Sequence, residues 1–249
     1  MRRLITAGGI AIIVGLLAGC EAPEEEPEPA PAVALEDQQA EPAGDEEEQD
    51  QAPPMRDLTS VDDDELGQRP DGVALAPGEE FEAVSVENAQ GESVDLHELA
   101  AEHPLLVFFY RGGWCPFCNT QIRDLTLANE GFSSHGVLPV AISVDQMGEA
   151  ARTQEAYEIP FPVLADPDLK AHEAFQVIYE ADDEEVERLA SMGIDLEASS
   201  GREHNSFAVP AVFLVSQGGE ILWSHADLDY RKRPTPQQLL TVIQDVLGE

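Results

Sequence analysis

Residues 105–119 read LLVFFYRGGWCPFCN, and this stretch decides the fold. Its first six residues are apolar, a run that is too short to cross a membrane and is typical of a strand buried on both faces of a parallel sheet. Gly112 and Gly113 permit a sharp bend, and Pro116 suits the first turn of a helix because its missing N–H has no partner to lose there. The pattern predicts a strand, a bend and a helix with Cys115 at its N-terminus.

The position of Cys115 matters chemically, because the thiolate is the nucleophilic form of cysteine and the partial positive charge of a helix N-terminus stabilises it. A thiol with a pKa of about 8.5 is only a few per cent ionised at pH 7, whereas a pKa of about 7 leaves half of it ionised. Cys118 follows within one helical turn, so the two sulfurs can close a disulfide. This Cys-x-x-Cys spacing favours reversible two-electron redox chemistry. A merely structural disulfide is the alternative, although so short a loop constrains the unfolded chain little.

The string Tyr110–Asn119 resembles the peroxiredoxin-like branch of the thioredoxin superfamily, the alkyl hydroperoxide reductase and thiol-specific antioxidant group. The resemblance extends from about Pro77 to the C-terminus and includes Val209-Pro210 and the segment DYRKRP at 229–234. It implies an α/β thioredoxin-like fold, with a central mixed sheet flanked by helices, and an antioxidant oxidoreductase that needs no cofactor or metal. It also implies that Pro210 is a cis-proline beside the cysteines, where it presents backbone to a bound thiol or disulfide.

The superfamily offers two assignments of the cysteine roles. Typical peroxiredoxins carry Pro-x-x-x-Thr-x-x-Cys, and matching that motif makes Cys118 the peroxide-attacking residue, with Cys115 in place of the threonine and Arg111 in place of the proline. Matching thioredoxin instead makes Cys115 the exposed nucleophile and Cys118 the buried resolving residue. We favour Cys115 as the nucleophile because it should lie nearer the helix terminus, and the missing threonine weakens the case for efficient peroxide reduction.

Two neighbours are candidate supporting residues. Arg111 lies four residues before Cys115 and could favour its thiolate electrostatically. Trp114 is expected to pack beside the cysteines and to restrict the access of water. The plain alternatives are a solvated arginine at a strand end and an ordinary core tryptophan. Of the six histidines, none has zinc-ligand spacing with the cysteines, so only a copper site with His204 as a third ligand is conceivable.

The first residues of the chain are typical of a targeting segment. Two arginines precede Leu4–Leu17, about 14 mostly apolar residues that would span roughly 21 Å as a helix, against a bilayer core of roughly 30 Å. Residues 17–20 resemble the lipobox of bacterial lipoproteins, which implies a signal peptide over 1–19 and lipid on Cys20, a stable membrane anchor. An ordinary signal peptide or a short anchor is the alternative. We expect a domain at the bacterial cell envelope, outside the cytoplasm, where a cysteine pair can be oxidised.

Residues 20–70 form an acidic segment that we expect to be a disordered tether for a domain at 71–249. From 21 to 70 there are 18 acidic side chains, eight prolines and no aromatic residue, so little apolar surface can offset the entropy of ordering. A docking tail for a basic partner is the alternative. The net charge of −37 argues against nucleic acid or an anionic lipid surface as a partner, since both would repel the chain.

Hydrophobic patterning predicts the remaining elements of the domain. They are a hairpin within 81–96, a short helix capped by Asp95, a helix from Cys115 to about Ser134, a strand at 137–144, a helix at 146–157, a short edge strand at 161–164, a hairpin of 211–215 with 220–224, and a last helix at 236–247. Strands that alternate with helices predict a parallel core sheet. Residues 177–206 interrupt the pattern with a short amphipathic helix, which could overhang the cysteines or be a surface excursion.

These observations favour an exported thiol oxidoreductase. A reduced cysteine would attack a hydroperoxide, the sulfenic acid would condense with the second cysteine, and an external thiol donor such as a thioredoxin-like protein would restore the dithiol. A thiol-disulfide reductase that acts on exported proteins is the enzymatic alternative. A copper-binding or scaffold lipoprotein is the non-enzymatic one.

Overall fold

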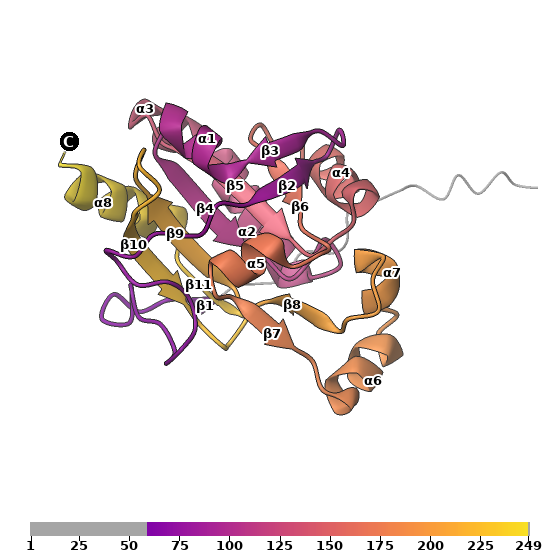
Figure 1. Ribbon diagram of the computed structural model, residues 1–249. Coiled ribbons are helices and arrows are strands. Elements are labelled where there is room, and N and C mark those ends of the chain that lie inside the picture. The colour runs from indigo at the N-terminus through magenta and orange to yellow at the C-terminus, as the bar shows by residue number, and fades with distance from the viewer. Residues whose placement is uncertain (1–58, 249) are drawn as a thin grey trace, which may run out of the picture. The chain divides into compact units, whose positions relative to one another are not determined.

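A computed structural model describes residues 59–248 of the chain, and Figure 1 shows their arrangement. The predicted signal peptide, the lipid on Cys20 and most of the acidic segment lie outside these residues. Within the described part of the chain, no helix is both long and apolar enough to cross a bilayer.

The centre of the fold is a seven-stranded mixed sheet with the order β10-β9-β4-β5-β6-β2-β3. Strands β4, β5 and β6 run parallel, and the outer strands are antiparallel to their neighbours. The sheet confirms the predicted mixed α/β class. Its strands are β2 (Ser85–Asn88), β3 (Ser93–Asp95), β4 (Leu105–Phe109), β5 (Leu138–Ser143), β6 (Val163–Ala165), β9 (Ala211–Val215) and β10 (Ile221–Ala226).

Helices cover both faces of this sheet. They are α1 (Leu96–Glu102), α2 (Pro116–Leu127), α3 (Asn129–Ser134), α4 (Met147–Ala156), α5 (Lys170–Ala174) and α8 (Pro236–Leu247). Alternate residues of β4 enter two separate cores: Phe109 packs with residues of α1 and α5, whereas Phe108 packs with residues of α2, α3 and α8. Every residue of β4 is buried, as the apolar run predicts.

Most predicted elements are present, and two expectations about them are wrong. The hairpin β2–β3, the Asp95 cap and α8 agree with the sequence analysis. The long helix expected from Cys115 ends at Leu127, and α3 begins after Ala128 as a separate helix. Strand β6 is no edge strand, because it pairs with both β5 and β2. Pro162 precedes β6, so it removes no ladder donor, and its carbonyl accepts the N–H of Ala141 at 2.9 Å.

The segment at 177–206 folds as a small unit of its own. Strands β7 (Ile178–Glu180) and β8 (Ser206–Ala208) pair antiparallel and enclose α6 (Asp183–Ser191) and α7 (Leu196–Ser200). The amphipathic pattern predicted α6 correctly: Leu189 is buried in a third apolar cluster, and Met192 beyond the helix is 56% exposed.

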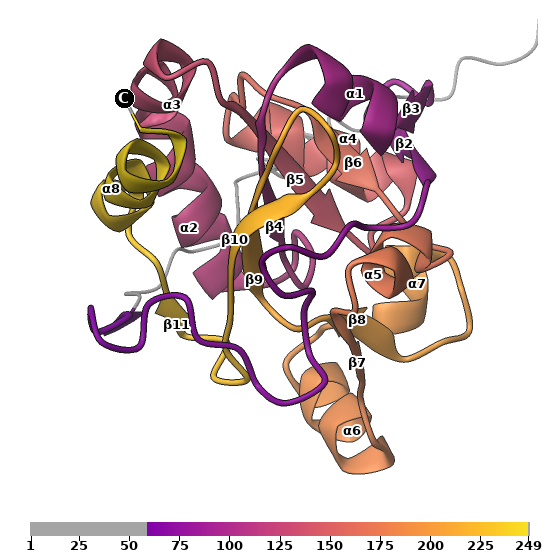
Figure 2. The same ribbon diagram turned by 60° about the vertical axis from the view of Figure 1, so that its left-hand side comes forward.

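The segment before residue 71 belongs to the folded domain where the structure describes it. Strand β1 (Thr59–Ser60) pairs in parallel with β11 (Lys232–Arg233), and the two lie side by side in Figure 2. Val61 is buried, which brings an apolar side chain of the acidic segment into the domain. The boundary expected at residue 71 is therefore too late, because composition averages over residues that find partners far along the chain.

Candidate active site

The bend between β4 and α2 presents the two cysteines. Gly112 has φ +150°, and a Cβ there would collide with the Trp114 indole nitrogen, so the bend requires glycine. The N–H of Gly113 donates to Oδ2 of Asp145 at 2.8 Å, which fixes the loop from below. Helix α2 then begins with Pro116 at its first position and Cys115 as its N-cap, as the sequence predicts.

No disulfide joins the two cysteines in this structure, and their sulfurs point toward each other at different depths. Their sulfurs are 2.7 Å apart, and the backbone N–H of Cys118 donates to Cys115 Sγ at 3.4 Å. Cys115 is 2% exposed and lines a cavity, whereas Cys118 is completely buried behind it. A substrate that enters the cavity therefore meets Cys115 first.

Arg233 supplies a positive charge to the buried sulfur. Its Nη2 donates to Cys118 Sγ at 3.4 Å, its Nη1 donates to Gln121 Oε1 at 2.8 Å, and its Nε donates to the carbonyl of Tyr230 at 2.8 Å. The side chain is only 2% exposed. An arginine held in this way stabilises a thiolate more than a solvated one would, because little water screens the two charges.

The pair shares its proton unequally. Burial raises the pKa of Cys118, but the hydrogen bond with Cys115 and the charge of Arg233 outweigh it and lower that pKa to about 5. Burial, together with the neighbouring Cys118, raises the pKa of Cys115 well above its ordinary value. The negative charge therefore resides on Cys118. The sequence analysis expected the helix N-terminus to favour the thiolate of Cys115, whereas burial and the neighbouring Cys118 oppose the ionisation of this residue.

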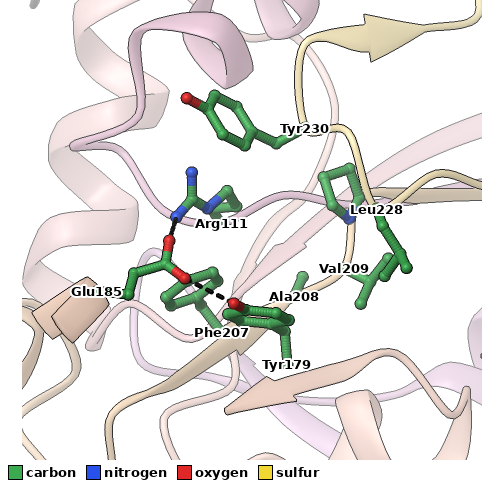
Figure 3. A pocket seen from close by; sticks show the side chains of 9 residues that line it. Arg111, Tyr179, Glu185, Phe207, Ala208, Val209, Leu228 and Tyr230 are labelled. Atoms are coloured by element: carbon green, nitrogen blue, oxygen red, sulfur yellow. Dashed lines mark hydrogen bonds and ion pairs between the residues drawn. The ribbon is translucent and has the colours of Figure 1, made fainter. Parts of the chain in front are cut away.

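Arg111 is not solvated, and it is surrounded by aromatic rings (Figure 3). Its guanidinium lies 4.3 Å from the ring centroid of Phe207, 4.6 Å from that of Tyr230 and 5.0 Å from that of Trp114. Glu185 of α6 forms an ion pair with it at 3.1 Å. Arg111 thus links the strand end to the helix of the 177–206 segment, and Trp114 packs beside the cysteines as predicted.

A cavity of about 620 Å³ opens above Cys115. Most of its walls are apolar, and two guanidinium groups contribute to its lining. The lining residues are Arg111, Trp114, Cys115, Pro116, Phe117, Arg188, Leu189, Met192, Ile194 and Tyr230. Four of these belong to α6 and the turn after it, so the 177–206 segment does overhang the cysteine that substrate would meet.

Pro210 is not cis, which corrects the sequence analysis. Every peptide bond in residues 59–248 is trans, the form that X-Pro bonds prefer by about 0.5–1 kcal/mol. Strand β8 leads directly into β9 here, and the N–H of Val209 donates to the carbonyl of Val177 at 2.7 Å. That backbone donor is therefore occupied by the 177–206 segment. Pro210 is one of the residues that line a second cavity of about 180 Å³. Figure 3 shows this cavity with Arg111, Phe207 and Tyr230 around it.

Asp145 is a buried carboxylate beneath the bend that the sequence analysis did not select. It accepts hydrogen bonds from Gly113 N–H and, at 3.0 Å, from the hydroxyl of Ser143. Burial raises its pKa to about 7. Its position offered a signal, because it directly follows a strand predicted beside the cysteine-bearing one, and the carboxyl ends of parallel strands meet at one edge. Arg233 had a weaker signal, its place in the DYRKRP segment.

The copper alternative finds no support in the described residues. Among 59–248, no three histidine, cysteine, aspartate or glutamate side chains gather as a metal site would require. His204, the expected third ligand, has both ring nitrogens engaged: Nε2 contacts the carbonyl of Pro167 at 2.8 Å, and Nδ1 contacts the N–H of Ser206 at 3.2 Å.

Comparisons with known proteins agree with this geometry. The model of the AhpC/TSA family matches residues 77–224. A Mycobacterium tuberculosis relative is 31% identical over 94 residues, 38% of this chain and 59% of that protein. Peroxiredoxin Bcp of Bacillus subtilis is 25% identical over 105 residues, 42% of this chain and 66% of that protein. The chain thus matches less than two thirds of either relative. The solved structure of reduced Prx3 from Vibrio vulnificus in complex with H2O2 shares the fold, with a TM-score of 0.56, 13% identity, and coverage of 68% of this chain and 99% of that one.

Proposed function

Because the chain belongs to the AhpC/TSA family, we propose that it is a thiol peroxidase that reduces hydroperoxides with the Cys115–Cys118 pair. One observation carries the proposal: the sulfur that lines the cavity touches a second sulfur, and a buried arginine contacts that second sulfur. The site thus combines an accessible nucleophile, a base and a resolving thiolate. The prediction of a peroxiredoxin-like family member is confirmed.

The reaction begins with a proton transfer across the 2.7 Å contact between the sulfurs. The Cys118 thiolate takes the proton of Cys115, and the Cys115 thiolate attacks the terminal oxygen of the hydroperoxide. The O–O bond breaks, and the alkoxide leaves as the alcohol after it takes the proton back from Cys118. Cys115 is then a sulfenic acid, and Cys118 is again a thiolate beside Arg233.

The second step closes the disulfide. The Cys118 thiolate attacks the sulfenic sulfur of Cys115, and hydroxide leaves. The dithiol has then given two electrons to the peroxide, and the products are the disulfide, an alcohol and hydroxide. An external thiol, such as that of a thioredoxin-like protein, reduces the disulfide by exchange at Cys115, the sulfur that lines the cavity.

Single-turnover kinetics with the two serine variants tests the proposal. The fully reduced chain should be oxidised by H2O2 and by an organic hydroperoxide much faster than free cysteine is. Cys115→Ser should lose this reaction, whereas Cys118→Ser should keep a slow one, because Cys115 then lacks its base. If the wild type reacts no faster than free cysteine, the peroxidase proposal is wrong. If Cys115→Ser reacts at the wild-type rate, Cys118 is the attacking residue.

The alternative activity is exchange with protein disulfides. The cavity above Cys115 supports it equally, because an incoming disulfide would meet the same sulfur. Rapid reduction of a disulfide-bonded protein by the dithiol, with slow peroxide oxidation, would favour this activity.

We also propose that lipid on Cys20 holds the domain at the bacterial cell envelope, outside the cytoplasm. The sequence Leu17-Ala18-Gly19-Cys20 after the apolar run supports the proposal. In a bacterial host, the wild-type chain should fractionate with membranes and Cys20→Ser should not. Equal release of both chains into the soluble fraction would contradict it.

A further inference from the structure

The segment Thr59–Glu65, which we call the strap, lies against the part of the chain that carries Arg233. Strand β1 of the strap is the only strand that pairs with β11 among the described residues. The N–H of Val61 donates to the carbonyl of Arg233 at 3.2 Å, and the N–H of Thr59 donates to the carbonyl of Arg231 at 3.0 Å. The strap therefore fixes the backbone at Arg233 and just before it.

The side chain of Gln238 in α8 also binds the strap. The amide nitrogen of Gln238 donates to the carbonyl of Val61 at 2.8 Å and to Asp63 at 2.9 Å. Its amide oxygen accepts the N–H of Thr235 at 2.9 Å within the capping box of α8. Thr235 lies two residues after Arg233, so the strap and the first turn of α8 hold β11 between them.

We propose that the strap is a positioning element of the thiolate site, which holds β11 so that the guanidinium of Arg233 reaches Cys118. The inference rests on the proposed function for its catalytic meaning and deepens it. Both the strap and β11 lie outside residues 77–224, where the family model matches. The matched segment therefore contains the dithiol but lacks the arginine that contacts it and the strand that holds this arginine.

The strap matters because Arg233 stabilises the Cys118 thiolate only while its guanidinium stays close to the sulfur. Arg233 is buried, and its interaction with the sulfur depends on distance in a region that water hardly screens. Strand β11 has two residues and no other sheet neighbour in the described part of the chain, so the strap supplies all of the strand pairing of its backbone. Without the strap, the guanidinium can move away from Cys118 and the thiolate loses its counter-charge.

The test is a pH titration of the ultraviolet absorbance of the thiolate, measured on the full-length, reduced chain with Cys20→Ser so that only the pair contributes. Val61→Pro removes the N–H that reaches the Arg233 carbonyl. We expect the midpoint of its titration to rise by at least about one pH unit, which is tenfold less thiolate at a given pH on the acid limb. Ser60→Pro is the matched control, because alternation along a parallel strand points the Ser60 N–H away from β11.

Two further variants keep the test decisive. Gln238→Glu keeps the acceptor of the capping box but loses the donor to the strap, so it should raise the midpoint in the same direction even if Val61→Pro folds poorly. In an Arg233→Gln background, Val61→Pro should cause no further shift, since the strap acts through Arg233. An unchanged midpoint in Gln238→Glu, an equal shift in Ser60→Pro, or an additive shift in the double variant would overturn the inference. The titration uses no peroxide, so failure of the peroxidase proposal would be seen separately.

Discussion

Two arginines flank the dithiol, and they are equally buried but differently compensated. Arg111 is 4% exposed and Arg233 is 2% exposed. Arg111 has a carboxylate partner, Glu185, and aromatic rings around its guanidinium. Arg233 contacts an amide oxygen, a carbonyl and Cys118, and in the described residues it forms no ion pair with a carboxylate.

The difference separates two tasks. A buried charge is costly unless an opposite charge balances it. The charge of Arg111 is balanced by the 177–206 segment, so Arg111 mainly anchors that segment above the cavity. The charge of Arg233 is balanced only when Cys118 is ionised, so Arg233 favours the thiolate. The pKa of Cys118 should therefore respond more strongly to the loss of Arg233 than to the loss of Arg111.

Arg233→Gln should have the largest effect. Without the guanidinium, the pKa of Cys118 rises from about 5 toward its ordinary value, and the hydrogen bond from Cys115 keeps part of the lowering. The fraction of Cys118 thiolate at pH 7 then falls by at least about tenfold, and single-turnover oxidation by peroxide slows with it. Stopped-flow rates across pH measure this. Arg123→Gln, an exposed charge on α2, is the control and should keep the wild-type profile.

Arg111→Gln should change the pH dependence of the peroxide rate less than Arg233→Gln does. Arg111 also lowers the pKa of Cys118, but less than Arg233 does, and Glu185 already balances part of its charge. We expect a rate loss of no more than about tenfold at pH 7. Arg111→Lys should recover only part of it, because a lysine keeps the charge without the planar stacking on the rings. A loss as large as that of Arg233→Gln would remove the distinction between the two arginines.

The sequence analysis was correct for the elements that are determined by residues close together in the chain. The strand, bend and helix start within 105–119 depend on local patterning, and α8 has its cap and its apolar face in one stretch. The peptide before Pro210 was predicted wrongly for the opposite reason: a family pattern was applied to a position whose surroundings the 177–206 segment has changed. There, Val209 pairs with Val177, a contact that no local signal announces.

The site was predicted only as far as its cysteines. Arg233 lies 115 residues from Cys118 in the sequence, and the strap that holds it came from a segment whose acidity indicated disorder. Glu185 is one carboxylate among many in an acidic chain. Such residues acquire their roles from topology, because β1 meets β11 and α6 meets the end of β4 only in the folded chain.

Glu185→Gln should lower the pKa of the thiolate, whereas the two arginine variants raise it, and the effect should be smaller than theirs. The variant leaves Arg111 in place but removes its counter-charge, so more of the Arg111 charge acts on the thiols. We expect the midpoint of the thiolate titration to fall by roughly half a pH unit. The pKa of Tyr179, which the hydrogen bond to Glu185 raises, should fall as well. Glu184→Gln, on the exposed side of α6, is the matched control. An upward shift of the midpoint would show that Glu185 favours the thiolate.

Asp145→Asn should have the smallest effect on the pKa of the thiols. Its main effect should be on the way the free energy of unfolding depends on pH. Burial raises the pKa of Asp145 from 3.8 to about 7, so the folded state keeps a proton that the unfolded state has lost. This contribution to stability is complete below about pH 4 and is lost as the pH rises through 7. Asparagine keeps an oxygen for the Gly113 N–H and has no proton to lose. In a Cys115→Ser, Cys118→Ser background, the unfolding free energy of the asparagine variant should therefore gain on that of the aspartate chain between pH 4 and 7, as urea unfolding would measure. If the two chains differ in unfolding free energy by the same amount at pH 4 and pH 7, Asp145 is already ionised in the folded state at pH 4. The N–H of Gly113 would then donate to a charged carboxylate and not to a neutral acid.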